Sequence, residues 1–163
     1  MLIHNWFPNP YLVGSGAKPN LDHCAAQYWT NPPQLNLEAT SGSIGYARWE
    51  IDGLPAGESL TASALVANRA NGERNQAIQV FDSSWNPILV LYAEANTDRK
   101  LAGEFTVPSD GIVLFRLCSP AGDGKSMTYQ RIIITRASTW EQVDALVPWN
   151  QPFGYRLMPI NRS

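Results

Sequence analysis

Apolar and polar residues alternate with a period of two along much of this sequence, as in strands with one buried face. The clearest run puts Leu60, Ala62 and Ala64 on one face and Thr61 and Ser63 on the other. Turn-forming Pro, Gly, Asn and Asp separate such runs every 8–12 residues or so, as in sandwiches and barrels. The predicted strands are residues 21–29, 34–39, 46–51, 59–67, 76–82, 87–93, 104–107, 112–118 and 129–136. We therefore expect an all-β fold of about eight or nine antiparallel strands.

One short helix is predicted near the C-terminus. Ser138 and Glu141 have the spacing of a capping box, in which both side chains bond to amides of the first turn. Trp140, Val143 and Leu146 then fall on one apolar face.

The 163 residues suit one domain. Residues 1–20 contain several Pro and Gly and are expected to form an N-terminal coil or arm, followed by the sandwich over 21–146. Residues 147–163 form a C-terminal tail that cannot hold a core alone. This tail either packs back on the domain or docks on a neighbouring subunit.

Two predicted strands are apolar on both faces, at residues 88–92 and 112–115. An antiparallel sheet with one wet face should alternate. The outer side of these strands is therefore expected to be covered, by the two termini or by a subunit interface.

Composition and charge argue against some classes of function. Charged residues are 16% and the formal net charge is −2, which argues against a general nucleic-acid binder. No apolar run is long enough to span a membrane, and residues 1–10 do not resemble a secretory signal. We expect synthesis in the cytoplasm.

Cys24 and Cys118 are predicted to be semi-buried thiols, with a disulfide bridge between them left open.

The sequence contains no complete catalytic or cofactor-binding motif. The Gly122–Ser126 run lacks the first glycine and the following helix of a phosphate loop. His4 and His23 are the only histidines, and no nucleophile elbow occurs. Strand carboxylates such as Glu38 and Glu50 are more simply solvated than catalytic. We expect a non-enzymatic protein with no cofactor and no metal site, although calcium bound by loop oxygens stays open.

Aromatic residues are the remaining signal. Six Trp and six Tyr exceed what one small core needs. Trp49 and Trp140 match the apolar phase of their elements, whereas Trp85 lies at a predicted hairpin tip. Exposed rings beside amide and guanidinium groups suit sugars and also protein interfaces. The candidate glycan-binding residues are Trp85, Trp29, Tyr46, Arg48 and Asn86. The candidate subunit-contact residues, in the termini, are Trp6, Phe7, Trp149, Phe153, Tyr155 and Arg156.

Three stretches carry a family resemblance. Asn5-Trp6-Phe7-Pro8-Asn9-Pro10 resembles the N-L-x-x-N-P opening of minor tail and other virion proteins of tailed phages. Residues 50–63 resemble the strand, G-L-x-A-G turn and next strand of the jelly roll that follows it, with Leu60 at a usual Tyr position. Residues 129–136, leading into Trp140-Glu141, are similar to its closing strand.

The resemblance implies a jelly-roll β-sandwich of the galactose-binding, carbohydrate-binding-module type. Residues 131–135 lack the acidic signature that often supports a calcium site in that family. We expect first a structural virion protein, in the tail or on the capsid surface. Its partners would be other virion proteins and copies of itself, with host-surface glycans as a secondary ligand. The alternative is a free carbohydrate-binding module.

Overall fold

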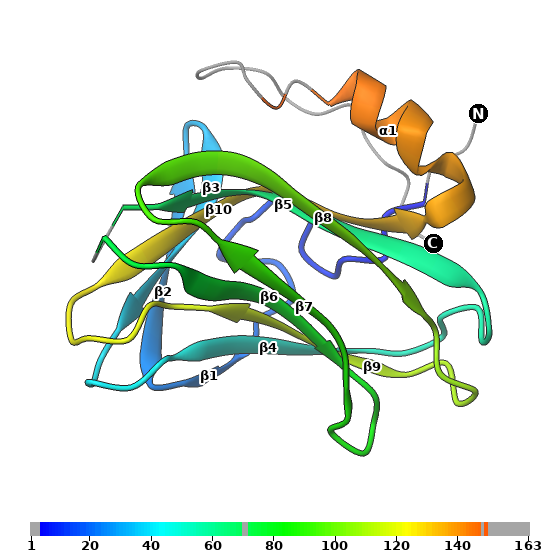
Figure 1. Ribbon diagram of the computed structural model, residues 1–163, viewed down its shortest axis with the longest axis horizontal. Helices are drawn as coiled ribbons and strands as arrows, with labels where there is room; N and C mark the ends of the chain where they lie inside the picture. The colour runs from blue at the N-terminus through cyan, green and yellow to red at the C-terminus, as the bar shows by residue number, and fades with distance from the viewer. Residues whose placement is uncertain (1–3, 70–71, 148, 150–163) are drawn as a thin grey trace.

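Two antiparallel sheets of five strands each face one another in a jelly-roll β-sandwich, which confirms the predicted fold class. The computed structural model describes residues 4–69, 72–147 and 149 (Figure 1). One sheet, here the β9 sheet, has the order β1 (Asn20–Asp22), β4 (Tyr46–Ile51), β9 (Val113–Cys118), β6 (Asn75–Phe81) and β7 (Pro87–Ala93). The other, the β10 sheet, has the order β2 (Cys24–Thr30), β3 (Pro33–Ala39), β10 (Ser126–Arg136), β5 (Ser59–Asn68) and β8 (Thr97–Thr106). Over the described residues, no helix has the length and apolarity needed to cross a bilayer.

The core lies between the sheets and follows the period-two pattern. On β5, Leu60, Ala62 and Ala64 are fully buried. On β3, Leu35 and Leu37 are fully buried as well. Alternation therefore assigned these inward faces correctly, because successive side chains of a strand point to opposite sides of the sheet.

The Tyr129 hydroxyl ties the two sheets together. Tyr129 lies on β10, and its fully buried hydroxyl is 2.6 Å from the carbonyl oxygen of Cys118 and 3.0 Å from that of Ala77, on β9 and β6. It also accepts a hydrogen bond from the Cys118 amide at 3.2 Å. The phenol thus satisfies polar backbone groups that the core would otherwise leave without partners.

We expect Tyr129→Phe to lower the free energy of unfolding by about 1–3 kcal/mol, because buried polar groups lose their partner while the ring is kept. Urea denaturation of both proteins measures the difference. An unchanged midpoint would contradict the assigned role of the hydroxyl.

The first predicted strand, over residues 21–29, is divided in two. His23 has φ +52, so the chain turns there, leaving β1 in the β9 sheet and β2 in the β10 sheet. Gly45 passes close to this turn: a Cβ at Gly45 would lie 2.5 Å from the His23 carbonyl oxygen. The strand β8 begins earlier than the predicted 104–107. The prediction was too short because the exposed first half of β8 shows no alternation of apolar and polar residues.

The N-terminal segment, expected to be an arm, packs into its own domain. Phe7 is 1% exposed, and its ring lies 5.0 Å from that of Trp49 and 5.6 Å from that of Phe115. The Asn5 side chain bonds to the carbonyl of Ile132 at 3.0 Å and to the amide of Ile134 at 2.9 Å. Since β3 pairs with β10 only over Ser126–Tyr129, the segment fills the edge of β10 that β3 leaves open.

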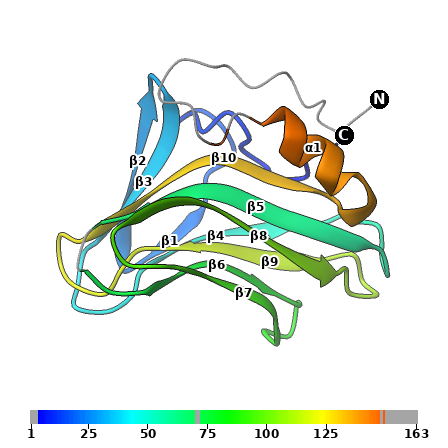
Figure 2. The ribbon, with the colours of Figure 1, turned by 45° about the horizontal axis from the view of Figure 1, so that its top comes forward.

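The helix α1 (Trp140–Leu146) lies on the outer side of the β10 sheet (Figure 2). The capping box prediction is wrong: the N-cap is Thr139, without a side-chain cap, and its hydroxyl donates to the Arg136 carbonyl at 3.0 Å. The reason is a 3₁₀ turn over Ala137–Thr139 that moves the helix start. Leu146 is 70% exposed, which corrects its placement on the apolar face.

Of the two strands predicted to be apolar on both faces, β9 has its outer side covered by neighbouring residues of the same chain. Leu114, on the outer side of β9, is 6% exposed and pairs with Phe81 of β6. Leu89 and Leu91 of β7 approach β8 at Gly103, where an added Cβ would lie 2.7 Å from Leu91. The outer side of β7 is less covered, since Tyr92 remains 37% exposed, so cover of that strand by another subunit stays a prediction.

Cys24 and Cys118 are both buried free thiols. Burial raises the pKa of Cys118 to about 12, so this thiol is protonated at neutral pH. The predicted thiol interpretation agrees with this arrangement.

Candidate functional site

The outer face of the β9 sheet carries a group of aromatic and cationic side chains. Tyr46 and Arg48 on β4 point outward because Ala47 and Trp49, which alternate with them, are in the core. Arg116 on β9 points outward by the same rule and is the register partner of Arg48.

The loop between β6 and β7 brings Trp85 to this face. The Asp82 carboxylate accepts hydrogen bonds from the Ser84 amide at 2.9 Å and from the Asn86 amide and side chain, both at 2.8 Å. These bonds, first of all the one from the Asn86 side chain, lower the pKa of Asp82. Asp82 therefore stays ionised and fixes the loop.

Trp85 has a backbone conformation that large side chains rarely adopt. Its φ is +67, and its ring lies 5.5 Å from that of Phe81 with 41% of the residue exposed. A bulky residue at positive φ is strained, and such strain is concentrated at functional sites. The loop thus holds a half-exposed indole against the sheet face.

Arg116 is enclosed by aromatic rings. Its guanidinium carbon lies 4.3 Å from the Tyr46 ring centroid, 4.5 Å from that of Trp85 and 5.0 Å from that of Phe81. The guanidinium carbon of Arg48 lies 5.2 Å from the Trp85 ring. These are cation–π distances, which order the two side chains. We call these five residues the aromatic–arginine cluster.

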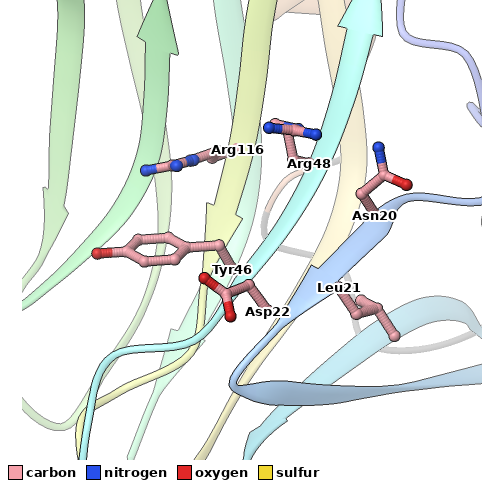
Figure 3. A pocket seen from close by; sticks show the side chains of 6 residues that line it. All are labelled: Asn20, Leu21, Asp22, Tyr46, Arg48 and Arg116. Atoms are coloured by element: carbon pink, nitrogen blue, oxygen red, sulfur yellow. The ribbon is translucent and has the colours of Figure 1, made fainter. Parts of the chain in front are cut away.

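A depression of about 140 Å³ adjoins the cluster (Figure 3). Asn20 and Leu21 border it on the β1 side, with Asp22 next to Tyr46. Burial raises the pKa of the Tyr46 phenol, so this ring carries a protonated hydroxyl at neutral pH. The depression is far smaller than pockets for drug-sized molecules, so a larger ligand would lie across the face and place one group in it.

The structure brings together three of the five predicted glycan-binding residues, namely Trp85, Tyr46 and Arg48. Asn86 lies in the same loop, where its side-chain amide donates to Asp82 and so positions Trp85. Trp29 is 45% exposed but lies on β2, in the other sheet, apart from this cluster.

Five residues of the site were not among the predictions: Arg116, Phe81, Asn20, Leu21 and Asp22. The signal for Arg116 was present, since it is the one charged residue among apolar neighbours on β9. Phe81 follows from the alternation of β6. Asn20 and Asp22 had no sequence signal, because only the turn at His23 places β1 beside β4.

The predicted subunit-contact residues of the termini lie elsewhere. Phe7 is a core residue, and Trp149, which is 9% exposed, packs with Ile133 of β10 and Val143 of α1. Burial within the domain contradicts the prediction that Phe7 and Trp149 are subunit contacts. Trp6 is partly buried, with Arg136 5.7 Å from its ring. Phe153, Tyr155 and Arg156 lie outside the described residues.

Among the residues with described positions, no three His, Cys, Asp or Glu side chains come together in a way that could hold a metal ion.

Solved structures of carbohydrate-binding modules share this two-sheet jelly-roll fold. A family 22 carbohydrate-binding module of Clostridium thermocellum Xyn10B is 12% identical with a TM-score of 0.60, over 83% of this chain and 96% of that one. TmCBM61, solved with β-1,4-galactotriose, is 13% identical with a TM-score of 0.58, over 81% of this chain and 98% of that one.

A third similar structure is the enzymatically active domain of tailspike protein 4 of bacteriophage CBA120. It is 12% identical with a TM-score of 0.60 over 80% of this chain. The match spans about a fifth of the tailspike chain, 21%. Comparison of the sequence with protein families and with curated proteins finds no match.

Proposed function

We propose that this protein binds a glycan chain across the outer face of the β9 sheet, without catalysing a reaction on it. The observation that carries the proposal is the aromatic–arginine cluster, where Trp85 remains 41% exposed beside two guanidinium groups. An indole face offers a flat apolar surface to the C–H groups of a sugar ring. The neighbouring arginines and Asn20 supply donors for its hydroxyl and ring oxygens.

The fold likeness supports this assignment. Two of the similar structures are carbohydrate-binding modules, and one of these was solved with a galactose trisaccharide. At such low sequence identity the likeness concerns the fold, so the contacts must come from this chain's own residues.

The test is isothermal titration of the full chain against a panel of oligosaccharides that includes galactan, xylan, glucan and polyuronate fragments. We expect Trp85→Ala to weaken binding of the best ligand roughly thirtyfold, as for an aromatic anchor worth about 2 kcal/mol. Trp29→Ala is the matched control, because Trp29 is similarly exposed, at 45%, but lies in the other sheet.

Each result of this titration is decisive. Loss of binding in the Trp85 variant with retention in the Trp29 variant supports the assigned face. Equal loss in both variants, or no binding to any member of the panel, overturns it. Shortening of the oligosaccharides during incubation would overturn the non-catalytic part of the proposal.

A second candidate function is that of a structural component of a tailed-phage virion. The likeness to a phage tailspike domain favours it, together with the resemblance of residues 5–10 to virion proteins. In this proposal the chain is assembled with other virion proteins and presents the β9 sheet to host-surface glycans. Sedimentation of particles from a producing host tests it: the chain should travel with intact particles, and its complete absence from them would refute the virion role.

A further inference from the structure

Arg48 and Arg116 form a like-charge pair on the proposed glycan-binding face. They are direct register partners on the antiparallel strands β4 and β9. Like charges directly opposite one another destabilise a sheet. Neither arginine has a carboxylate within ion-pair distance among the described residues, whereas Arg69, Arg74, Lys100 and Arg136 all do.

The arrangement also leaves hydrogen-bonding capacity unused. The Nε atom of Arg116 is buried and has no hydrogen-bond partner. The rings of Tyr46, Trp85 and Phe81 surround the guanidinium group, so its orientation is set before any ligand arrives. A side chain ordered in advance loses less entropy on binding.

We propose that the ligand is an acidic glycan, and that the carboxylate of a uronic acid unit binds between Arg48 and Arg116. This inference rests on the proposed function and specifies its ligand class. A planar guanidinium group matches a carboxylate with two parallel hydrogen bonds, and an anion relieves the repulsion between the two cations. The depression of about 140 Å³ beside them admits a pendant group of a sugar while the chain lies across the face.

Two carboxylates of the protein limit where the acid group can bind. Asp22 borders the depression and lies 3.6 Å from the His23 ring nitrogen, and Glu50 is exposed two residues beyond Arg48. A ligand carboxylate therefore binds on the Arg116 side of Arg48, away from Asp22. Asp22→Asn removes a repelling charge and is expected to tighten binding of the acidic ligand a few-fold.

The experiment uses two matched ligand pairs with the full chain. One pair is β-1,4-oligomannuronate and β-1,4-oligomannose of equal length, and the other is oligogalacturonate and its methyl ester. Within each pair we expect the acid form to bind at least tenfold tighter, as for charge-assisted hydrogen bonds. Raising the salt concentration should reduce this preference, because screening weakens the attraction.

Three variants locate the effect. Arg48→Gln and Arg116→Gln should each remove most of the preference for the acid form, and Arg116→Lys should restore only part of it because the ammonium group lacks the fork. Arg74→Gln is the matched control: its guanidinium carbon lies 4.2 Å from the Tyr92 ring, but Glu94 already pairs with it at 2.9 Å. Thermal melting of each variant verifies that it is folded.

The outcomes separate the two proposals. If neutral glycans bind as tightly as the acid forms through Trp85, the acidic ligand class is refuted and the glycan site stands. If acid forms bind but the two Gln variants keep the preference, the assignment to these arginines falls. If polyglutamate binds as well as the uronates, the face selects charge and not sugar, and if no glycan binds, both proposals fall.

Discussion

Phe7→Ala is expected to lower the free energy of unfolding by about 3–5 kcal/mol, as for large aromatic residues removed from a core. Phe7 is 1% exposed and packs against the rings of Trp49 and Phe115, so its removal leaves a cavity. Total stability of a domain is only about 5–15 kcal/mol, so the change is a large part of it. Urea denaturation at equilibrium measures the difference.

Leu146→Ala provides the contrast for this prediction. Leu146 is 70% exposed on the helix α1, so its truncation should change the free energy of unfolding by less than about 0.5 kcal/mol. If the Phe7 variant were as stable as the Leu146 variant, the N-terminal segment would not belong to the core.

Asn5→Ala is expected to cost about 2–3 kcal/mol, because it leaves several buried backbone groups without partners. The Asn5 side chain serves the Ile132 carbonyl, the Ile134 amide and, at 3.1 Å, the Phe7 amide. It thus takes the place of a neighbouring strand where β10 has no β3 partner.

Native-state hydrogen exchange gives this second prediction a local readout. The Ile134 and Phe7 amides should exchange faster in the Asn5 variant than its overall loss of stability accounts for, whereas amides of β6 should follow that overall loss. If the Ile134 amide exchanged no faster than the β6 amides, Asn5 would not act as its ladder partner.

Periodicity in the sequence was enough to predict the fold class and the inward faces. Leu60, Ala62 and Leu35 are fully buried, as their alternation required. Alternation could not identify the first half of β8, because an edge strand paired on one side tolerates polar residues at every position. It also could not show the division of residues 21–29, which depends on the positive φ of His23.

The N-terminal segment shows a second limit of prediction from local sequence patterns. Pro8 and Pro10 prevent a regular strand, and this suggested an arm. Burial does not require regular structure, however: Asn5 and Phe7 enter the core through one side-chain amide and one ring. Such long-range contacts, between residues about 130 positions apart, leave no local pattern in a sequence.

The candidate site was predictable in part. Trp85 could be assigned to a hairpin tip and Arg48 to an outer face from the chain alone. The sequence prediction missed Arg116 because its neighbours on β9 are apolar, although the period of two puts its side chain on the outer face, where it is the register partner of Arg48. Trp29 shows why exposure alone is insufficient, since its strand belongs to the other sheet.

One of the two edge strands of the β10 sheet, β8, affects how the protein behaves at high concentration. β8 carries the exposed side chains of Asp98, Arg99, Lys100 and Glu104 along its free edge. Hydrated charges in that position discourage a second molecule from extending the sheet through its own backbone. Concentrated preparations should therefore resist fibre growth from this border, and any lattice of many copies would have to be joined through other surfaces.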